Sequence, residues 1–310
     1  MQKEQKDSSS IRTFLEPSLG QYVLSIKPRN HIISTMASEN GSLASYWIER
    51  GNDLFRLGNY DEAIKAYERT IHIDPKNAES WNSVGLALCY LEKHKEAIET
   101  FDRALEIDPE YNDALNNKGV VLYKLKRYDE AIRCFDHIIN LDPKYAKSWY
   151  NKGVVLGKMG KYQEAIEHYD KTLEIDPARP KVWNNKGAAL GILGRYDEAI
   201  ECFDRAIELG PKNAEAWNNK GAALGKLGRY DEAMEHFDIA IGIDPEYSEA
   251  WYNKGEALRR RDKYVEAIEC FDKAIEIEPR HSKAWNTKGL ALRALGCDVE
   301  ADAAFANAGA

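Results

Sequence analysis

The sequence has few cysteines, no long hydrophobic run and no excess of basic charge, and each absence excludes a class of protein. Five cysteines cannot all pair, and the N-terminus has no apolar run typical of a signal peptide, which favours a reducing, cytoplasmic location. Because the longest apolar runs are only a few residues, no segment is predicted to span a membrane. The net charge of −8 gives the chain as a whole no attraction to nucleic acid or anionic lipid.

The sequence does contain a repeat of 34 residues. Tryptophan, glycine and proline recur at this interval, and Leu115 replaces the tryptophan in one unit. The prolines are Pro75, Pro109, Pro143, Pro177, Pro211, Pro245 and Pro279. The tryptophans are Trp47, Trp81, Trp149, Trp183, Trp217, Trp251 and Trp285, each followed four residues later by glycine. A single compact domain does not repeat in this way, so the chain is predicted to be an array of similar units.

Each unit is predicted to contain two helices. Trp183, Gly187 and Leu190 follow the 3.6-residue period of one helix face. The second helix opens at the sequence Tyr-Asp-Glu-Ala, where Asp197 and Glu198 favour a helix N-terminus by capping and through the helix dipole. An Asp-Pro pair ends the second helix of most units, because proline lacks a backbone donor and restricts the residue before it.

The repeated residues resemble those of the tetratricopeptide repeat (TPR) family. Large, small, aromatic and helix-breaking residues stand where that family has them, as in Trp217, Gly221, Leu224, Tyr230, Ala233, Phe237, Ala240 and Pro245. The resemblance implies an all-α fold, a right-handed α-α superhelix (solenoid) of about eight TPR helix hairpins whose first helices line a concave groove. The predicted units are 44–77, 78–111, 112–145, 146–179, 180–213, 214–247, 248–281 and 282–310. Residues 1–43 are expected to form a flexible or weakly structured N-terminal arm, and Met36 is an alternative start of translation.

Two columns of opposite charge run through the array with an offset of one unit. The lysines are Lys118, Lys152, Lys186, Lys220, Lys254 and Lys288, and the aspartates are Asp102, Asp136, Asp170, Asp204, Asp238 and Asp272. Pairing each aspartate with the lysine of the following unit uses every member of both columns, whereas pairing within units leaves one of each without a partner. We therefore expect a ladder of ion pairs between units, with two independently solvated columns as the alternative.

A column of asparagines is the candidate ligand site. It comprises Asn117, Asn151, Asn185, Asn219 and Asn253, two residues after each tryptophan position. An amide both donates and accepts, so spaced asparagines can hold a peptide backbone without reading its side chains. The column is similar to the asparagine-lined grooves of TPR peptide receptors and of the TPR superhelix of a protein O-linked sugar transferase. The alternative is a general preference of the repeat for asparagine.

Two further features point to the same face. Gly157, Gly191 and Gly225 lie six residues after successive asparagines, and glycine inside a helix suggests close approach either of a ligand backbone or of the facing helix. Arg259 and Arg293 belong to a basic patch that could receive an acidic side chain or a C-terminal carboxylate, with a solvated helix face as the alternative.

No enzymatic chemistry is predicted. Cys134, His168, Cys202, His236 and Cys270 form a column, but successive units lie about 10 Å apart, which is too far for shared zinc ligation at roughly 2.0–2.3 Å. We expect no catalytic residue, metal or cofactor, and a protein or peptide partner in place of nucleic acid or membrane. The predicted function is a protein-interaction scaffold. A self-assembly module forming homo-oligomers, and a non-catalytic regulatory subunit of an enzyme encoded elsewhere, remain as alternatives.

Overall fold

The computed structural model describes residues 39–309, and in this range every regular element is a helix. The helices are α1 (Glu39–Arg56), α2 (Tyr60–Ile73), α3 (Ala78–Tyr90), α4 (His94–Ile107), α5 (Asn112–Lys124), α6 (Tyr128–Leu141), α7 (Ala146–Lys158), α8 (Tyr162–Ile175), α9 (Pro180–Ile192), α10 (Tyr196–Leu209), α11 (Ala214–Lys226), α12 (Tyr230–Ile243), α13 (Ser248–Arg260), α14 (Tyr264–Ile277), α15 (Ser282–Ala294) and α16 (Asp298–Ala308). The predicted all-α fold of two helices per unit is confirmed. The first helix begins at Glu39, inside the predicted arm, whereas the rest of the arm and Met36 lie outside the described residues.

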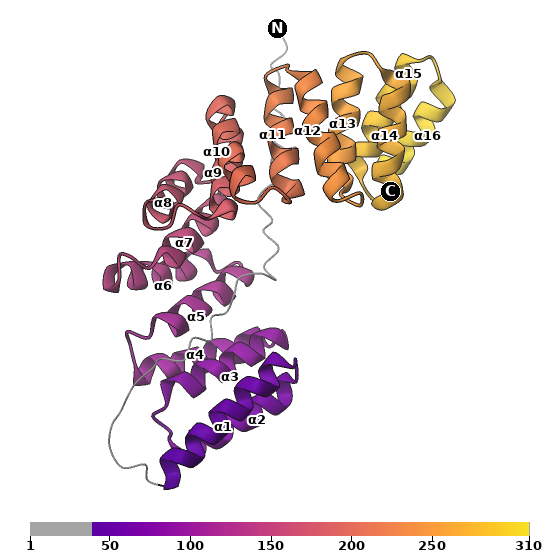
Figure 1. Cartoon of the computed structure of the whole chain (residues 1–310). Helices are drawn as coiled ribbons and strands as arrows, with labels where there is room; N and C mark the ends of the chain where they lie inside the picture. The colour runs from indigo at the N-terminus through magenta and orange to yellow at the C-terminus, as the bar shows by residue number, and fades with distance from the viewer. Residues whose placement is uncertain (1–38, 310) are drawn as a thin grey trace. The chain divides into compact units, whose positions relative to one another are not determined.

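The described chain forms two compact units, residues 39–160 and 161–309. In the first, α1 pairs with α2, α3 with α4 and α5 with α6 as antiparallel hairpins, and α7 follows (Figure 1). In the second, α8 precedes the hairpins α9/α10, α11/α12, α13/α14 and α15/α16 (Figure 1). The predicted repeat 146–179 is therefore divided between the two compact units, with α7 in the first and α8 in the second.

Within a hairpin, a glycine of the first helix packs against an aromatic ring of the second. A Cβ added to Gly221 would lie 2.7 Å from Cε1 of Phe237, well inside the ordinary carbon contact of about 3.5–4.0 Å. The same arrangement joins Gly51 to Tyr67, Gly85 to Phe101, Gly119 to Phe135, Gly187 to Phe203, Gly255 to Phe271 and Gly289 to Phe305. This glycine therefore sets how closely the two helices of a unit approach.

The second helices have acidic residues in their first turn, but these residues do not cap the helix as the sequence predicted. Arg195 is the N-cap of α10 and makes no side-chain capping bond, so Asp197 and Glu198 lie in the first turn. The capping part of the prediction is wrong, because the carboxylates start one residue inside the helix. The dipole argument still applies to that turn. Glu198 accepts two hydrogen bonds from Arg195, at 2.6 and 2.7 Å.

The indole groups tie each turn between units to the helix that follows it. Trp217 Nε1 donates to the carbonyl oxygen of Pro211 at 2.9 Å, and Trp251 Nε1 donates to that of Pro245 at 3.0 Å. The same bond recurs at Trp81, Trp149, Trp183 and Trp285, with distances of 2.9–3.2 Å. The tryptophan and proline columns thus meet at the junctions between units.

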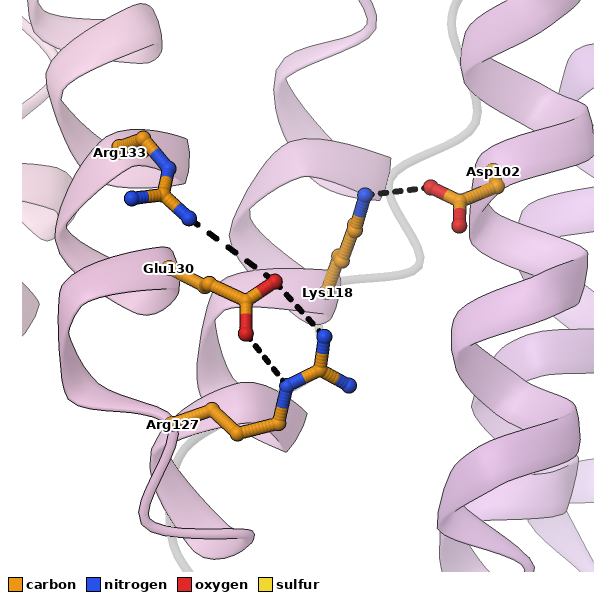
Figure 2. A network of polar contacts seen from close by, with 5 residues as sticks. All are labelled: Asp102, Lys118, Arg127, Glu130 and Arg133. Atoms are coloured by element: carbon orange, nitrogen blue, oxygen red, sulfur yellow. Dashed lines mark hydrogen bonds and ion pairs between the residues drawn. The ribbon is translucent and has the colours of Figure 1, made fainter.

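The predicted ladder of ion pairs between units is confirmed. Lys220 Nζ lies 2.7 Å from Asp204 Oδ1, and Lys152, Lys186 and Lys254 are 2.6 Å from the aspartates of the preceding units. Lys118 and Lys288 pair with Asp102 and Asp272 in the same way. Figure 2 shows Lys118 of α5 pointing to Asp102 of α4, beside Glu130, which is flanked by Arg127 and Arg133. The lysine side chains are 18–24% exposed and the aspartates 43–55%, so each pair bridges two helices near the surface.

The last hairpin presents a polar outer face. Asp302 and Gly309 are exposed at positions where other units carry apolar residues. Asp302 pairs with Arg293 at 2.8 Å, and the Arg293 guanidinium lies 4.8 Å from the centre of the Phe305 ring. Phe305 is therefore partly covered, and α16 is polar at these two positions, as terminal repeats need, although its Val299 is exposed.

Candidate ligand-binding groove

Four members of the predicted asparagine column bond to the preceding repeat. Asn117, Asn151, Asn185 and Asn219 are buried, with 2–5% of each residue exposed, and Asn253 is partly buried. Nδ2 of Asn219 donates to Oδ1 of Asn184 at 3.0 Å. The same bond joins Asn117 to Asn82, Asn151 to Asn116 and Asn253 to Asn218, at 2.8–3.0 Å. The amide nitrogens of these four residues therefore hold neighbouring units together.

The partner asparagines were not identified from the sequence. Asn82, Asn116, Asn184 and Asn218 directly follow the tryptophan position, 35 residues before the asparagine that bonds to them. The offset matching that revealed the charged ladder would also have revealed these pairs. Each of these bonds uses one of the two hydrogens of the donating amide. The oxygen of Asn117 accepts from Nδ2 of Asn116 at 3.4 Å. Oδ1 of Asn219 is buried and has no hydrogen-bond partner.

A second layer of polar groups supports the asparagine pairs. Asn184 Nδ2 donates to Glu215 Oε1 at 3.1 Å, and Asn218 Nδ2 donates to the Tyr247 hydroxyl at 3.4 Å. Burial raises the pKa of Glu215, and the bond from Asn184 and the charge of Lys181 act in the opposite direction. Burial also lowers the pKa of Lys181. Because its folded-state pKa is raised, Glu215 lowers the stability of the fold as the pH rises through its titration range.

A cavity of about 320 Å³ opens between the first helices α9, α11 and α13, and the beginnings of α10 and α12 contribute to its walls. Its lining comprises Ala188, Gly191, Tyr196, Phe203, Asn219, Ala222, Ala223, Gly225, Lys226, Tyr230, Phe237, Tyr252, Asn253, Glu256, Ala257 and Arg260. We call it the tyrosine cavity. It contains two members of the predicted asparagine column, Asn219 and Asn253, together with groups from three successive units.

The glycines of the tyrosine cavity face open space. A Cβ added to Gly191 or Gly225 would meet no atom within 4 Å other than its own helix and chain neighbours. Of the two explanations that the sequence left for these glycines, close approach of a facing helix does not apply to either. Close approach of a ligand backbone stays a prediction for both.

The two predicted arginines have partners within the chain. Arg259 donates to both oxygens of Glu256, at 2.7 and 2.9 Å, and Arg260 donates to Glu256 at 3.0 Å. Glu256 and Arg260 line the tyrosine cavity, so Arg259 adjoins it through Glu256. Arg293, which pairs with Asp302, is not among the lining residues.

The cysteine and histidine column does not form a metal site. Within residues 39–309, no group of three histidine, cysteine or acidic side chains could hold a metal ion. Burial raises the pKa of Cys134, Cys202 and Cys270 to about 11, so these thiols are unreactive at neutral pH. Across the same residues no helix is long and apolar enough to cross a membrane.

Comparison with known proteins identifies the repeat. Sequence models described as tetratricopeptide repeat match residues 48–112 and 184–248, and further models of the same description match 113–145, 146–178 and 248–281. Together these segments make up more than half of the chain. No curated protein matches the sequence significantly.

Three solved structures are similar to the chain. YrrB, described as a TPR protein with an unusual peptide-binding site, is 28% identical with a TM-score of 0.51, over 62% of this chain and 98% of YrrB. A tetratricopeptide repeat protein from Parabacteroides merdae is 17% identical with a TM-score of 0.63, over 81% of this chain and all of its own. PilF from Pseudomonas aeruginosa is 23% identical with a TM-score of 0.63, over 71% of this chain and all of its own. The last two support the fold alone.

Proposed function

The chain belongs to the tetratricopeptide repeat family, whose members generally mediate protein–protein interactions, and on that premise we propose a scaffold that binds an extended segment of a partner protein along its first helices. The observation that carries the proposal is the tyrosine cavity, where Asn219 and Asn253 stand beside glycines that border open space. A backbone can approach such a surface closely because no side chain intervenes. The peptide-binding site ascribed to YrrB supports the same class of ligand.

The hydrogen bonds of the asparagines indicate how they would bind a ligand. Nδ2 of Asn219 is bonded to Asn184 and its Oδ1 has no partner, so a ligand backbone N–H that donates to Oδ1 would satisfy this acceptor. A buried acceptor without a partner costs about 1–3 kcal/mol, and a bound N–H would recover part of that cost. We propose this role for Asn219 and Asn253, and a contribution to ligand binding from Asn117, Asn151 and Asn185 in their own repeats. Arg259 and Arg293 would lie beside the path of the segment.

The proposed scaffold is non-enzymatic and cytoplasmic. The proposal is supported by the use of residues 39–309 for sixteen helices that pack as repeats of the tetratricopeptide family. A regulatory subunit of another enzyme would use the same groove, so this alternative differs in the identity of the partner and not in the mode of binding.

The test fills the cavity without disturbing the fold. Gly225→Leu adds a side chain to open space in α11, and Gly242→Leu is its matched control, since Gly242 is also the next-to-last residue of its helix, also faces open space and lies outside the cavity. The probe is a random twelve-residue peptide library displayed on phage and selected against the full chain. We expect the wild type and Gly242→Leu to retain peptides and Gly225→Leu to lose them. If the wild type retains none, or all three retain the same peptides, the groove is not the binding site.

Self-assembly is a second candidate, favoured by exposed apolar groups on the last hairpin. Leu290 and Leu295 are 45% and 44% exposed, and Val299 is 81% exposed. Light scattering would then give a mass that rises with protein concentration and falls back in Val299→Glu. A mass that stays that of one chain over the whole concentration range excludes this candidate.

A further inference from the structure

The tyrosine cavity is a local feature of two units and not a general property of this repeat. It exists because Gly191 and Gly225 stand where five other units have the larger residues Phe55, Cys89, Tyr123, Arg259 and Arg293, and one further unit has Gly157. Small residues also occupy the place three positions earlier in each of the two helices, Ala188 and Ala222. Because these side chains are missing, the tyrosine cavity is open here. We refer to its interior as the recess. In units with a large residue at this place, that side chain occupies the corresponding space.

The walls of the recess are aromatic. Tyr196 and Tyr230 enter from the second helices α10 and α12, and Tyr252 enters from α13. The Tyr252 ring packs against the ring of His281, at 5.1 Å between ring centres, and against that of Phe271, at 6.1 Å. With alanine and glycine as its floor, the recess offers apolar surface to a side chain that enters it.

The charges around the recess are unbalanced. Its charged lining residues are Lys226, Arg260 and Glu256. Lys226 is exposed and forms no ion pair with any residue between 39 and 309. Glu256 is shared by Arg260 and Arg259, so the lining has two cations and one carboxylate, and that carboxylate is already paired. The surplus of positive charge at this edge is complementary to a carboxylate.

A buried polar atom marks where a backbone would lie. Asn219 is 2% exposed and lines the recess, and its Oδ1 has no hydrogen-bond partner. It is an acceptor without a donor, on a residue that lines the same cavity as Gly191 and Gly225. This observation is independent of the charges and of the small residues.

We propose that the tyrosine cavity is the specificity subsite of the groove, and that it takes a bulky apolar side chain flanked in sequence by an aspartate or glutamate. The apolar group would lie between the tyrosines above Gly191 and Gly225, its own backbone N–H would donate to Asn219, and the neighbouring carboxylate would pair with Lys226 and Arg260. This inference rests on the proposed function, because it names the chemistry of the segment that the groove binds.

The experiment uses the composition of the peptides retained by the wild type in the selection above. We expect an apolar residue larger than valine beside an acidic residue to be enriched. A synthetic fluorescein-labelled peptide from this set is then titrated by fluorescence polarisation against wild type and against Lys226→Glu/Arg260→Glu. Both positions are exposed, so the fold should tolerate their reversal. We expect the affinity to fall about tenfold or more, and a matched peptide with lysine in place of the acid to bind the variant better than the wild type.

The outcomes separate the two proposals. An empty selection refutes both the groove and the subsite. Retained peptides without an apolar and acidic pair, or a double variant whose affinity is unchanged, overturn the subsite and leave the groove standing. If the retained peptides match stretches of this chain and the mass in light scattering falls in Gly225→Leu, the occupant is a second copy, which overturns the assignment to a different partner protein.

Discussion

Two glycines four residues apart in α11 should respond in opposite ways to the same substitution. Gly221 faces its hairpin partner, where an added Cβ would lie 2.7 Å from Cε1 of Phe237, 2.9 Å from Cδ1 and 3.1 Å from the backbone oxygen of Ala233. Gly225 faces the tyrosine cavity, where nothing lies within 4 Å. Replacing Gly221 with alanine therefore adds a methyl group where the space is already filled, whereas replacing Gly225 adds the same group where the space is empty.

The expected change in the free energy of unfolding is the sum of a helix-propensity contribution and an overpacking contribution. Alanine is favoured over glycine in a helix by about 0.5–1 kcal/mol, and both variants gain this amount. Only Gly221→Ala also overpacks the core, since Phe237 is 2% exposed and cannot move into solvent, and overpacking typically costs about 1–3 kcal/mol. Gly225→Ala should thus stabilise the fold by about 0.5–1 kcal/mol. The difference between the two variants should equal the overpacking cost, about 1–3 kcal/mol.

Urea unfolding of the full chain measures the free energy of unfolding of each variant. The loss of helix is monitored by circular dichroism at about 222 nm. Combining Gly221→Ala with Phe237→Leu supplies the control, because a smaller and more flexible side chain leaves room for the methyl group, and the two changes should couple by about 0.5–3 kcal/mol. Equal stability of Gly221→Ala and Gly225→Ala would refute the view that the glycine–aromatic contact sets the spacing of the hairpin.

The contacts between units and the cysteines give three more expectations. A double-mutant cycle of Lys220→Met and Asp204→Asn should give a coupling of about 0.2–1 kcal/mol that falls as salt is added, and a larger coupling independent of salt would contradict a pair this near the surface. Asn184→Ala removes the acceptor of a buried amide and should lower the free energy of unfolding by about 1–3 kcal/mol in the same urea assay, and unchanged stability would mean that the amide finds another partner. Cys297, which is partly exposed, should react first with iodoacetamide at neutral pH, as read by mass spectrometry of peptides. Burial raises the pKa of Cys202 to about 11, so its labelling should increase only as the pH rises toward that value, and early labelling of Cys202 would show that its helix opens.

The sequence predicted the hairpins and the charged ladder because the information lies in strict spacing. A 34-residue period fixes where Trp217 and Pro211 recur, and the offset of the lysine and aspartate columns identifies which neighbour each residue meets. These predictions require only the position of each residue within the 34-residue repeat. For this reason the ion pairs between units could be named before any coordinates were known.

The role of the asparagines could not be settled in the same way. Helical spacing places Asn219 on a face of the first helix, but it does not say how much of that face the next unit covers. The answer depends on side-chain packing, which buries Asn219 against Asn184. The tyrosine cavity was missed for the same reason, since Tyr196 and Tyr230 reach it from the second helices, where the sequence gives no sign that they turn toward the first.

The lysine–aspartate pair recurs at six successive junctions and the asparagine pair at four of them, which makes units that share both interchangeable. Were residues 214–247 deleted, Asp204 would meet Lys254 in place of Lys220, and Asn184 would meet Asn253 in place of Asn219. Gene segments of this length can therefore be lost, duplicated or recombined without a new interface having to evolve. The lining of the groove would change with each such event while the stacking stayed the same, so the array can acquire a new ligand by shuffling whole units.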